Sequence, residues 1–373
     1  MAIGNHRNAS LVVDRKAIYH NIHEAKKRLK DNTDLFMVLK ANGYGFGATE
    51  VAKVAKKAGA SGFCVAILDE ALELRRTGFD DPILVLGISR IQDVPLIVKE
   101  HVSVTVSSVE WLKNAESVLQ DNHISNKLLV HIGLDTGMGR IGFQTPDELS
   151  KAIHFMNAHD NIEFEGIFTH FATADSKDDH YFKVQFHRFQ KLMQVVKHRP
   201  KYVHVSNSAT SLWHAACNGN MIRLGASGYG LNPSGRELTP PYHLDSAISL
   251  VSEIVYTKKV KKGRSIGYGA TYTADCDQWI GTVPIGYADG YSRSLGGFYV
   301  LVNGQRCPIV GRICMDQFMI RLPEDVQPGT KVTLIGQDSN QKITLQDIAD
   351  YCHTINYEVT CDFSRRLPIH YIN

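Results

Sequence analysis

The sequence predicts an α/β fold, a (β/α)₈ TIM-type barrel followed by a second, mainly β domain. Short apolar runs alternate eight times with helical segments between about residues 15 and 243. Pro240-Pro241 then marks a break, and the apolar runs beyond it are short, with a type I′ hairpin signal at Asn303-Gly304. An open doubly wound sheet is the competing arrangement, but no Gly-x-Gly-x-x-Gly motif follows the first strand.

Composition limits the classes of function. The chain has 373 residues, enough for two domains, and its 43% hydrophobic and 21% charged residues suit a large core. A net charge of +3 without a basic stripe argues against a nucleic-acid partner. No apolar stretch approaches the ~18–20 residues of a membrane span and no signal peptide is visible, so we expect a cytoplasmic protein without membrane association. The seven cysteines form no Cys-x-x-Cys pair, which disfavours disulfides and zinc.

In the barrel domain, expected at residues 15–243, each predicted strand is a short apolar run. Each predicted helix has apolar residues three or four positions apart. The predicted strands are Leu35–Leu39, Phe63–Ala66, Ile83–Leu86, Val102–Val106, Leu128–Ile132, Phe164–Phe168, Tyr202–Val205 and Met221–Arg223. The predicted helices are Arg15–Leu29, Thr49–Ala58, Asp69–Arg76, Val94–Lys99, Glu110–Leu119, Asp147–Met156, Tyr181–Lys197 and Ala209–Ala215.

The second domain is expected at residues 244–373 and reads as β-rich. Its predicted strands are Leu250–Tyr256, Trp279–Pro284, Phe298–Val302, Met319–Leu322 and Val332–Ile335. Only Leu345–Tyr351 has a helical pattern. A separate apolar run at residues 8–14 predicts an isolated strand before the barrel.

The segment Val38–Gly47 is the strongest local signal of chemistry. It places Lys40 at the end of the first barrel strand, followed by three glycines spaced by Tyr44 and Phe46. A buried ammonium is costly unless it is paired or neutralised, and formation of a Schiff base is one way to neutralise it. The glycines allow the backbone to approach a ligand closely. A lysine that simply enters solvent before a tight loop would give the same pattern.

The carboxyl ends of barrel strands form the active face of such folds. Leu86, the segment Asp135–Arg140, His170, the segment His204–Ser208 and the segment Arg223–Ala226 all follow predicted strands. Each has an ordinary structural explanation alone, but they converge on one end of the barrel.

Pyridoxal phosphate fits this set of residues. Lys40 would bind its aldehyde, and Tyr44, Ser208, Gly225 and Ala226 would offer hydroxyl and backbone N–H donors to its phosphate. A metal site from His131, His170 and His204 is less favoured, because we expect no carboxylate or further histidine at ligand spacing near them.

Nine motifs in order, from about residue 10 to the C-terminus, closely resemble the alanine racemase family. The motifs are Lys40–Gly45, Leu134–Arg140, Thr169-His170-Phe171, Asn207-Ser208, Arg223-Leu224-Gly225, Gly267–Tyr272, Pro284–Gly290, Gly311–Gln317 and Ile355–Glu358.

The resemblance implies a barrel that binds pyridoxal phosphate, a C-terminal β domain against which the strand of residues 1–14 packs, and a head-to-tail homodimer with active sites shared between subunits. Lys40 and Tyr268 would be the catalytic residues, with Tyr268 and Met315 reaching the partner's site. The implied cofactor-binding residues are Lys40, Tyr44, Leu86, His170, Asn207, Ser208, Arg223, Gly225, Ala226 and Tyr357. Arg140 and Met315 would bind the substrate carboxylate, and His204, Tyr287 and Asp316 would support the site.

The implied reaction is interconversion of L-alanine and D-alanine by two bases on opposite faces of the substrate. Lys40 would serve the D-enantiomer and Tyr268 the L-enantiomer. A phenol in water loses its proton only near pH ~10, so a nearby cation is needed to lower the pKa of Tyr268. The resemblance places His170 beside this tyrosine and Arg140 near the substrate carboxylate. Arg223 would face the cofactor ring nitrogen, donate a hydrogen bond but no proton, and so favour racemisation over transamination.

Two positions depart from the family pattern. Gly133 stands where members often carry a lysine whose carbamate orients the substrate-binding arginine, and Phe46 stands where a histidine is common. We expect altered substrate affinity from Gly133 and little consequence from Phe46.

Three alternatives stay open at this point. A racemase for serine or for larger or basic amino acids would share the scaffold. A non-enzymatic pyridoxal-phosphate carrier would lack residues 245–373, and a decarboxylase would carry a carboxylate in place of Arg223. The family role implies supply of D-alanine for peptidoglycan.

Overall fold

The computed structural model describes residues 2–373 and divides into two compact units. One unit is the barrel, Ala17–Asp245. The other unit joins Ser246–Asn373 with the N-terminal segment up to Lys16. No described helix is both long enough and apolar enough to cross a membrane.

The first unit contains eight parallel strands in the order β8-β7-β6-β5-β4-β3-β2-β9. The barrel closes between β8 and β9 through a single bridge of Ser206 and Ile222. This arrangement confirms the predicted barrel and excludes the open doubly wound sheet. The strands are β2 (Asp34–Val38), β3 (Gly62–Val65), β4 (Ile83–Ile88), β5 (Val102–Val106), β6 (Leu128–Gly133), β7 (Ile162–Phe168), β8 (Tyr202–His204) and β9 (Met221–Leu224).

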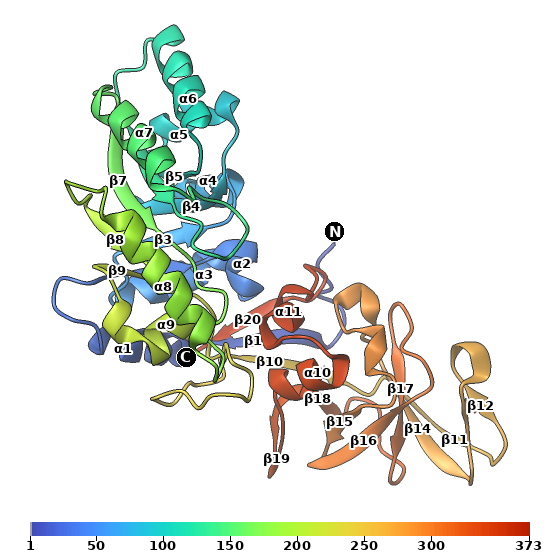
Figure 1. Cartoon of the computed structure of the whole chain (residues 1–373). Helices are drawn as coiled ribbons and strands as arrows, with labels where there is room; N and C mark the ends of the chain where they lie inside the picture. The colour runs from blue at the N-terminus through green and yellow to red at the C-terminus, as the bar shows by residue number, and fades with distance from the viewer. Residues whose placement is uncertain (1) are drawn as a thin grey trace. The chain divides into compact units, whose positions relative to one another are not determined.

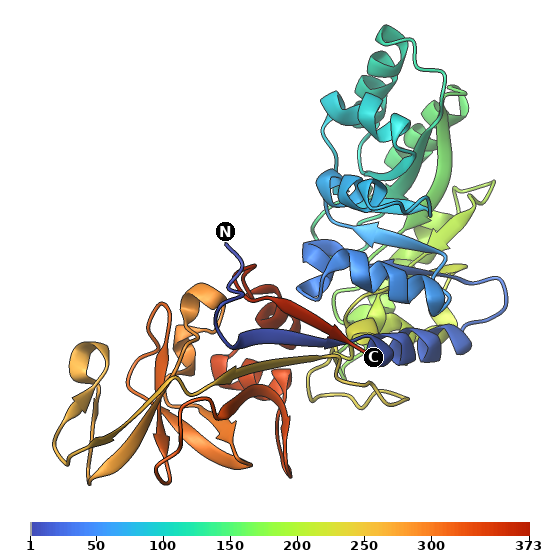
Figure 2. The same cartoon turned by 180° about the vertical axis from the view of Figure 1, so that it is seen from behind.

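Most residues of these strands are apolar because both faces of each strand are covered. Inside, a buried cluster forms from Phe36, Val38, Cys64, Leu84, Tyr202 and Met221. Outside, helices run between the strands and cover the barrel (Figures 1 and 2). The helices are α1 (Arg15–Lys27), α3 (Ala48–Lys57), α4 (Leu68–Arg76), α5 (Val94–Lys99), α6 (Val109–Asp121), α7 (Pro146–Asn157), α8 (His180–Met193) and α9 (Ser208–Trp213).

The second unit is built on a ten-stranded sheet with the main order β11-β14-β17-β16-β15-β18-β10-β1-β20. The strand β1 (Ala9–Asp14) pairs antiparallel with β10 (Ile248–Glu253) and parallel with β20 (Ile369–Ile372), and Figure 1 shows the three side by side. The other strands are β11 (Tyr256–Val260), β14 (Gln278–Val283), β15 (Tyr299–Val302), β16 (Gln305–Val310), β17 (Phe318–Leu322), β18 (Lys331–Asp338) and β19 (Gln341–Ile343). A small hairpin, β12 (Ser265–Ile266) with β13 (Tyr272–Thr273), stands apart.

The predicted hairpin at Asn303-Gly304 is confirmed. These two residues join β15 to β16 with φ values of 50° and 73°, the positive pair that a type I′ turn requires.

Two predictions for this unit were wrong. The expected strand Leu250–Tyr256 is split into β10 and β11, because the chain changes partner from β18 to β14 there. Leu345–Tyr351 is not the only helix, since α11 (Asn356–Cys361) follows α10 (Leu345–Cys352). A six-residue helix is too short to show a convincing apolar period.

Asn21 binds the backbone of Asp245, the last residue of the barrel unit. Its buried side chain donates to the Asp245 carbonyl at 2.9 Å and accepts from the Asp245 N–H at 2.8 Å. We expect Asn21→Ala to lower the free energy of unfolding by about 2–3 kcal/mol, because both backbone groups lose their partner. Denaturant titration would measure this loss. The exposed Asn114, replaced by alanine as a control, should change this free energy by less than about 0.5 kcal/mol, and equal effects would contradict the assignment.

Candidate active site

Lys40 lies two residues after the end of β2 and begins an unusual turn. Ala41, Asn42, Gly43 and Tyr44 have φ values of 53°, 53°, 61° and 55°, so the chain makes a left-handed helical turn. For the three residues that are not glycine this conformation costs roughly 1–2 kcal/mol each. The strain of this turn therefore lies mainly in Ala41, Asn42 and Tyr44 and not in the glycines of the motif.

The buried ring of Tyr229, from the segment after β9, supports this turn. Its hydroxyl donates to the Val38 carbonyl at 2.7 Å, and its ring lies 4.8 Å from the ring of Tyr44 and 4.9 Å from that of Phe46. The Lys40 Nζ lies 5.8 Å from the centre of the Tyr44 ring. Tyr44 and Leu86 both pack against the inner apolar cluster of the barrel.

A cradle of hydroxyl and N–H groups lies at the end of β9. The Ser208 hydroxyl accepts from the Gly225 N–H at 2.9 Å and from the Ser227 N–H at 3.3 Å. The buried Ser227 hydroxyl has no partner of its own. A Cβ at Gly225 would lie 2.8 Å from the Tyr44 hydroxyl, so glycine keeps this space open. The unpartnered Ser227 hydroxyl and the space kept open beside Gly225 suit an anionic phosphate.

Arg223 lies on β9 and is only 3% exposed. Its Nη1 lies 2.6 Å from His204 Nδ1, and its Nη2 donates to the Thr169 carbonyl at 2.9 Å. His170 Nδ1 lies 3.4 Å from Nη2. Burial, reinforced by Arg140, lowers the pKa of Arg223 to about 10, which leaves the guanidinium charged at neutral pH.

The hydrogen bonds continue from Arg223 through the barrel interior. His204 Nε2 lies 2.9 Å from His131 Nδ1, and His131 Nε2 lies 3.1 Å from Glu165 Oε2. Ser103 donates to the same carboxylate oxygen at 2.5 Å. Since a guanidinium can only donate, His204 Nδ1 must accept, and each histidine then donates from Nε2 toward Glu165. We call Arg223, His204, His131 and Glu165 the buried polar line.

Gly166 makes room for this line. A Cβ at that position would lie 2.3 Å from His131 Nδ1. The pairing of β6 with β7 also shifts register between Val130 and His131. The histidine ring thus occupies space that any other residue on β7 would fill.

Glu165 corrects the expectation that no carboxylate lies near these histidines. It was missed because a glutamate within a largely apolar strand has no spacing that relates it to histidines on other strands. Its oxygen is occupied by N–H and O–H donors, and no group of three or more candidate metal ligands occurs within residues 2–373.

All three histidines near Arg223 are held neutral. Burial lowers the pKa of His131, opposed by Glu165, and burial with Arg223 lowers the pKa of His204 well below its usual value. The pKa of His170 falls to about 3, through burial and the charges of Arg223, Arg140 and Lys40. The charges of Lys40, Arg140 and Arg223, all predicted site residues, therefore all lower the pKa of His170.

The segment before Arg140 is held by Asp135. Its carboxylate accepts from the N–H groups of Gly137 and Gly139, both at 3.0 Å, and Arg140 itself is exposed. Asn207, predicted to bind the cofactor, uses its side-chain oxygen to cap α9 through the Thr210 N–H at 2.9 Å. Ala226 follows Gly225 as predicted and is buried.

The remaining predicted residues lie in the second unit. Tyr268 sits on a tight turn between β12 and β13 and is 71% exposed. Met315 and Tyr287 are also exposed, and the Tyr287 N–H bonds to the Cys314 carbonyl at 3.1 Å, so these two segments adjoin. Tyr357 lies on α11 and is partly buried.

Asp289 organises this part of the unit and was not singled out from the sequence. The fully buried carboxylate pairs with Arg7 and, at 2.9 Å, with Arg366. It also accepts from the Gly286 N–H at 3.0 Å, and Arg366 reaches Asp316 at 2.8 Å. One carboxylate thereby fixes the segments that carry Tyr287 and Met315.

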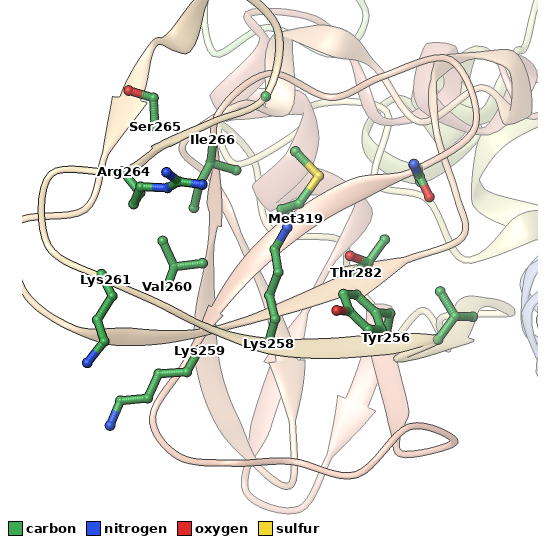
Figure 3. Close-up of a pocket in the computed structure, with 13 residues that line it drawn as sticks. Tyr256, Lys258, Lys259, Val260, Lys261, Arg264, Ser265, Ile266, Thr282 and Met319 are labelled. Atoms are coloured by element: carbon green, nitrogen blue, oxygen red, sulfur yellow. The ribbon is translucent and has the colours of Figure 1, made fainter.

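A hollow of about 830 Å³ in the second unit is separate from these residues. Figure 3 shows it beside β11, with Lys258, Lys259, Lys261 and Arg264 around it. None of the predicted site residues lines this hollow. Lys258 and Lys259 are exposed on β11, an edge strand, where they disfavour pairing with another sheet.

Comparisons with known proteins cover both units. The family model described as the alanine racemase N-terminal domain matches residues 13–233, and the C-terminal domain model matches residues 247–371. The alanine racemase of Levilactobacillus brevis is 59% identical, over 99% of each chain.

Solved structures agree with the family models. The alanine racemase from E. faecalis superposes with a TM-score of 0.97 at 53% identity, over 100% of both chains. A histidine racemase from Leuconostoc mesenteroides subsp. sake superposes with a TM-score of 0.93 at 35% identity, also over 100% of both chains. The chain belongs to the alanine racemase family of isomerases.

Proposed function

We propose that the protein interconverts L-alanine and D-alanine with pyridoxal 5′-phosphate as cofactor. The observation that carries this proposal is the convergence at one barrel end of Lys40, the buried cation Arg223 and the cradle of Ser208, Gly225 and Ser227. Membership of the family supplies the reaction.

The residues present fit the cofactor. Lys40 would hold its aldehyde carbon, and the cradle with Tyr44 would receive its phosphate. The phosphate would then give the unpartnered Ser227 hydroxyl a hydrogen-bond partner. Leu86, Asn207, Ala226, His170 and Tyr357 are the further proposed contacts. When bound, this cofactor makes the Cα–H bond of an amino acid acidic enough to lose its proton.

Arg223 would face the ring nitrogen as a permanent donor. The buried polar line supports this role, because two neutral histidines connect the guanidinium to the negative Glu165. Such a cation donates a hydrogen bond but keeps its own proton at neutral pH. This would limit charge delocalisation into the ring and favour return of the proton to Cα.

Two bases would handle the Cα proton from opposite faces. Lys40 serves the D-enantiomer, and Tyr268 of the partner subunit serves the L-enantiomer. The large exposed surface of Tyr268 supports a homodimer in which a second chain covers this phenol. Tyr287 and Asp316 would shape the same interface.

The substrate carboxylate would be bound by Arg140 and the Met315 N–H of the second subunit. Because His170 is neutral, the cation that favours a phenolate would be Arg140 rather than this histidine. We place the reaction in the cytoplasm, as a source of D-alanine for peptidoglycan.

A racemase for another amino acid is the second candidate. The likeness to a histidine racemase shows that related chains act on a different side chain. Turnover of alanine against serine, lysine, arginine and histidine would separate the two. The second unit argues against a barrel-only carrier, and Arg223 argues against a decarboxylase.

Deuterium exchange tests the two-base proposal. Pure L-alanine in deuterated water should yield D-alanine with deuterium at Cα, and the enzyme should show the visible absorbance of bound pyridoxal phosphate. Tyr268→Phe should lower racemisation by about 10²–10⁴-fold, yet D-alanine should still exchange its Cα proton through Lys40. Tyr256→Phe is the control on the same unit. Equal loss of exchange from both enantiomers in Tyr268→Phe would contradict the assignment.

Acid should destabilise the barrel before it protonates typical carboxylates. Histidines in the unfolded chain take up protons near pH ~6.5, whereas His131, His170 and His204 stay neutral in the folded state. Because the pKa of His170 is about 3 in the folded state, this residue contributes a fall in the free energy of unfolding of about 1.4 kcal/mol per pH unit between about pH 6 and pH 3, and His131 and His204 contribute in the same direction. Denaturant titrations from pH 7.5 to 5 should show a shallower slope for His170→Asn but not for the exposed His123→Gln. A free energy that is flat over this range would refute the charge states.

Gly133 offers a test of substrate binding. A Cβ there would lie 3.6 Å from Phe168 and Thr105 atoms, an ordinary contact, so a lysine can begin at this position. We expect Gly133→Lys to change the KM for alanine in a manner that depends on carbon dioxide, because a carbamate could then orient Arg140. A KM that stays constant across a carbon dioxide titration would show that Arg140 is oriented independently.

A further inference from the structure

The left-handed turn after Lys40 is tied to the next strand of the barrel by one carboxylate. Glu70 Oε1 accepts from the Ala41 N–H at 2.7 Å, and Oε2 accepts from the Ala66 N–H at 2.8 Å and the Ile67 N–H at 3.3 Å. Ala41 is the residue after Lys40, and Ala66 is the residue after β3. The carboxylate thus joins the ends of two adjacent strands.

Helix capping accounts for only one of these three bonds. Glu70 lies in the first turn of α4, and its Oε2 bond to the Ile67 N–H is the usual capping arrangement. The Oε1 bond crosses 29 residues to the lysine turn and adds nothing to the helix.

The turn needs an external partner because its own conformation is unfavourable. Ala41 has φ 53° and ψ 51°, and its N–H points out of the turn to Glu70. At the other end, the Asn42 side chain accepts from the Ala48 N–H at 3.0 Å, where α3 begins. The first of these ties adjoins Lys40 directly.

We propose that Glu70 is a positioning residue that fixes the backbone at Lys40 and so sets the lysine for reaction with the cofactor. This rests on the proposed role of Lys40. Through Ala41, Glu70 holds the turn left-handed and limits the directions in which the lysine side chain can leave β2.

Glu70→Gln is a sharp test because it keeps the shape and loses one acceptor. With its oxygen on the α4 cap, the amide NH₂ of glutamine would face the Ala41 N–H, and two donors repel. We expect amide hydrogen exchange in residues 41–47 to accelerate at least about tenfold, which is the usual worth of one charge-assisted bond. The affinity of the cofactor-free enzyme for pyridoxal phosphate, measured by visible absorbance, should fall by a similar factor.

Three further variants separate positioning from general stability. Glu73→Gln, an exposed carboxylate on the same helix, should change neither readout. Glu70→Asp retains the charge and the capping ability but is one methylene shorter, so it should also lose the Ala41 bond. Ala41→Gly in the Glu70→Gln background should restore uptake in part, because glycine adopts the left-handed turn without strain.

The outcomes are distinct. Unchanged exchange at residues 41–47 in Glu70→Gln, or an equal rise across the whole barrel, would overturn the positioning role. If the parent enzyme fails to take up pyridoxal phosphate, the proposed cofactor fails, while hydrogen exchange still decides whether Glu70 holds the turn.

Discussion

A buried guanidinium must be balanced, and the way this barrel balances Arg223 shapes much of its interior. The nearest hydrogen-bond partners of Arg223 are neutral, namely His204, His170 and backbone carbonyls. The negative charge stands two imidazoles away, on Glu165. Because every bond in the line points the same way, the protonation of each member depends on its neighbours. Gly166 and the register shift between Val130 and His131 leave room for the His131 ring, which belongs to this line.

The lysine turn and the buried polar line solve different parts of one problem. The line would keep a cation beside the ring nitrogen of the cofactor, and the turn presents the amine of Lys40. Both depend on contacts between segments distant in sequence: Glu70 with Ala41, Tyr229 with Val38, and Ser208 with Gly225. Strain in the turn is tolerated because these contacts over-determine it. The same principle applies in the second unit, where Asp289 gathers Arg7 and Arg366 around the segments carrying Tyr287 and Met315.

Much of the fold could be predicted from local pattern. Eight apolar runs separated by amphipathic helices define a barrel, since buried parallel strands are apolar on both faces. The type I′ turn at Asn303-Gly304 is equally local. The division of residues 250–256 between two strands could not be predicted, because the sequence does not record a change of strand partner. Nor could the short helix at Asn356–Cys361, which is stabilised by packing rather than by period.

By itself the sequence determined which residue types reach the end of each barrel strand: Lys40, His170, Ser208 and Arg223 can all be read from positions after apolar runs. Only the tertiary structure decided that Glu165 would be the partner of His131, that His170 would be neutral, and that Glu70 would hold the lysine turn. The physical reason is that position along a strand is a local property. Protonation and hydrogen-bond partners depend on burial and on charges that only folding brings together.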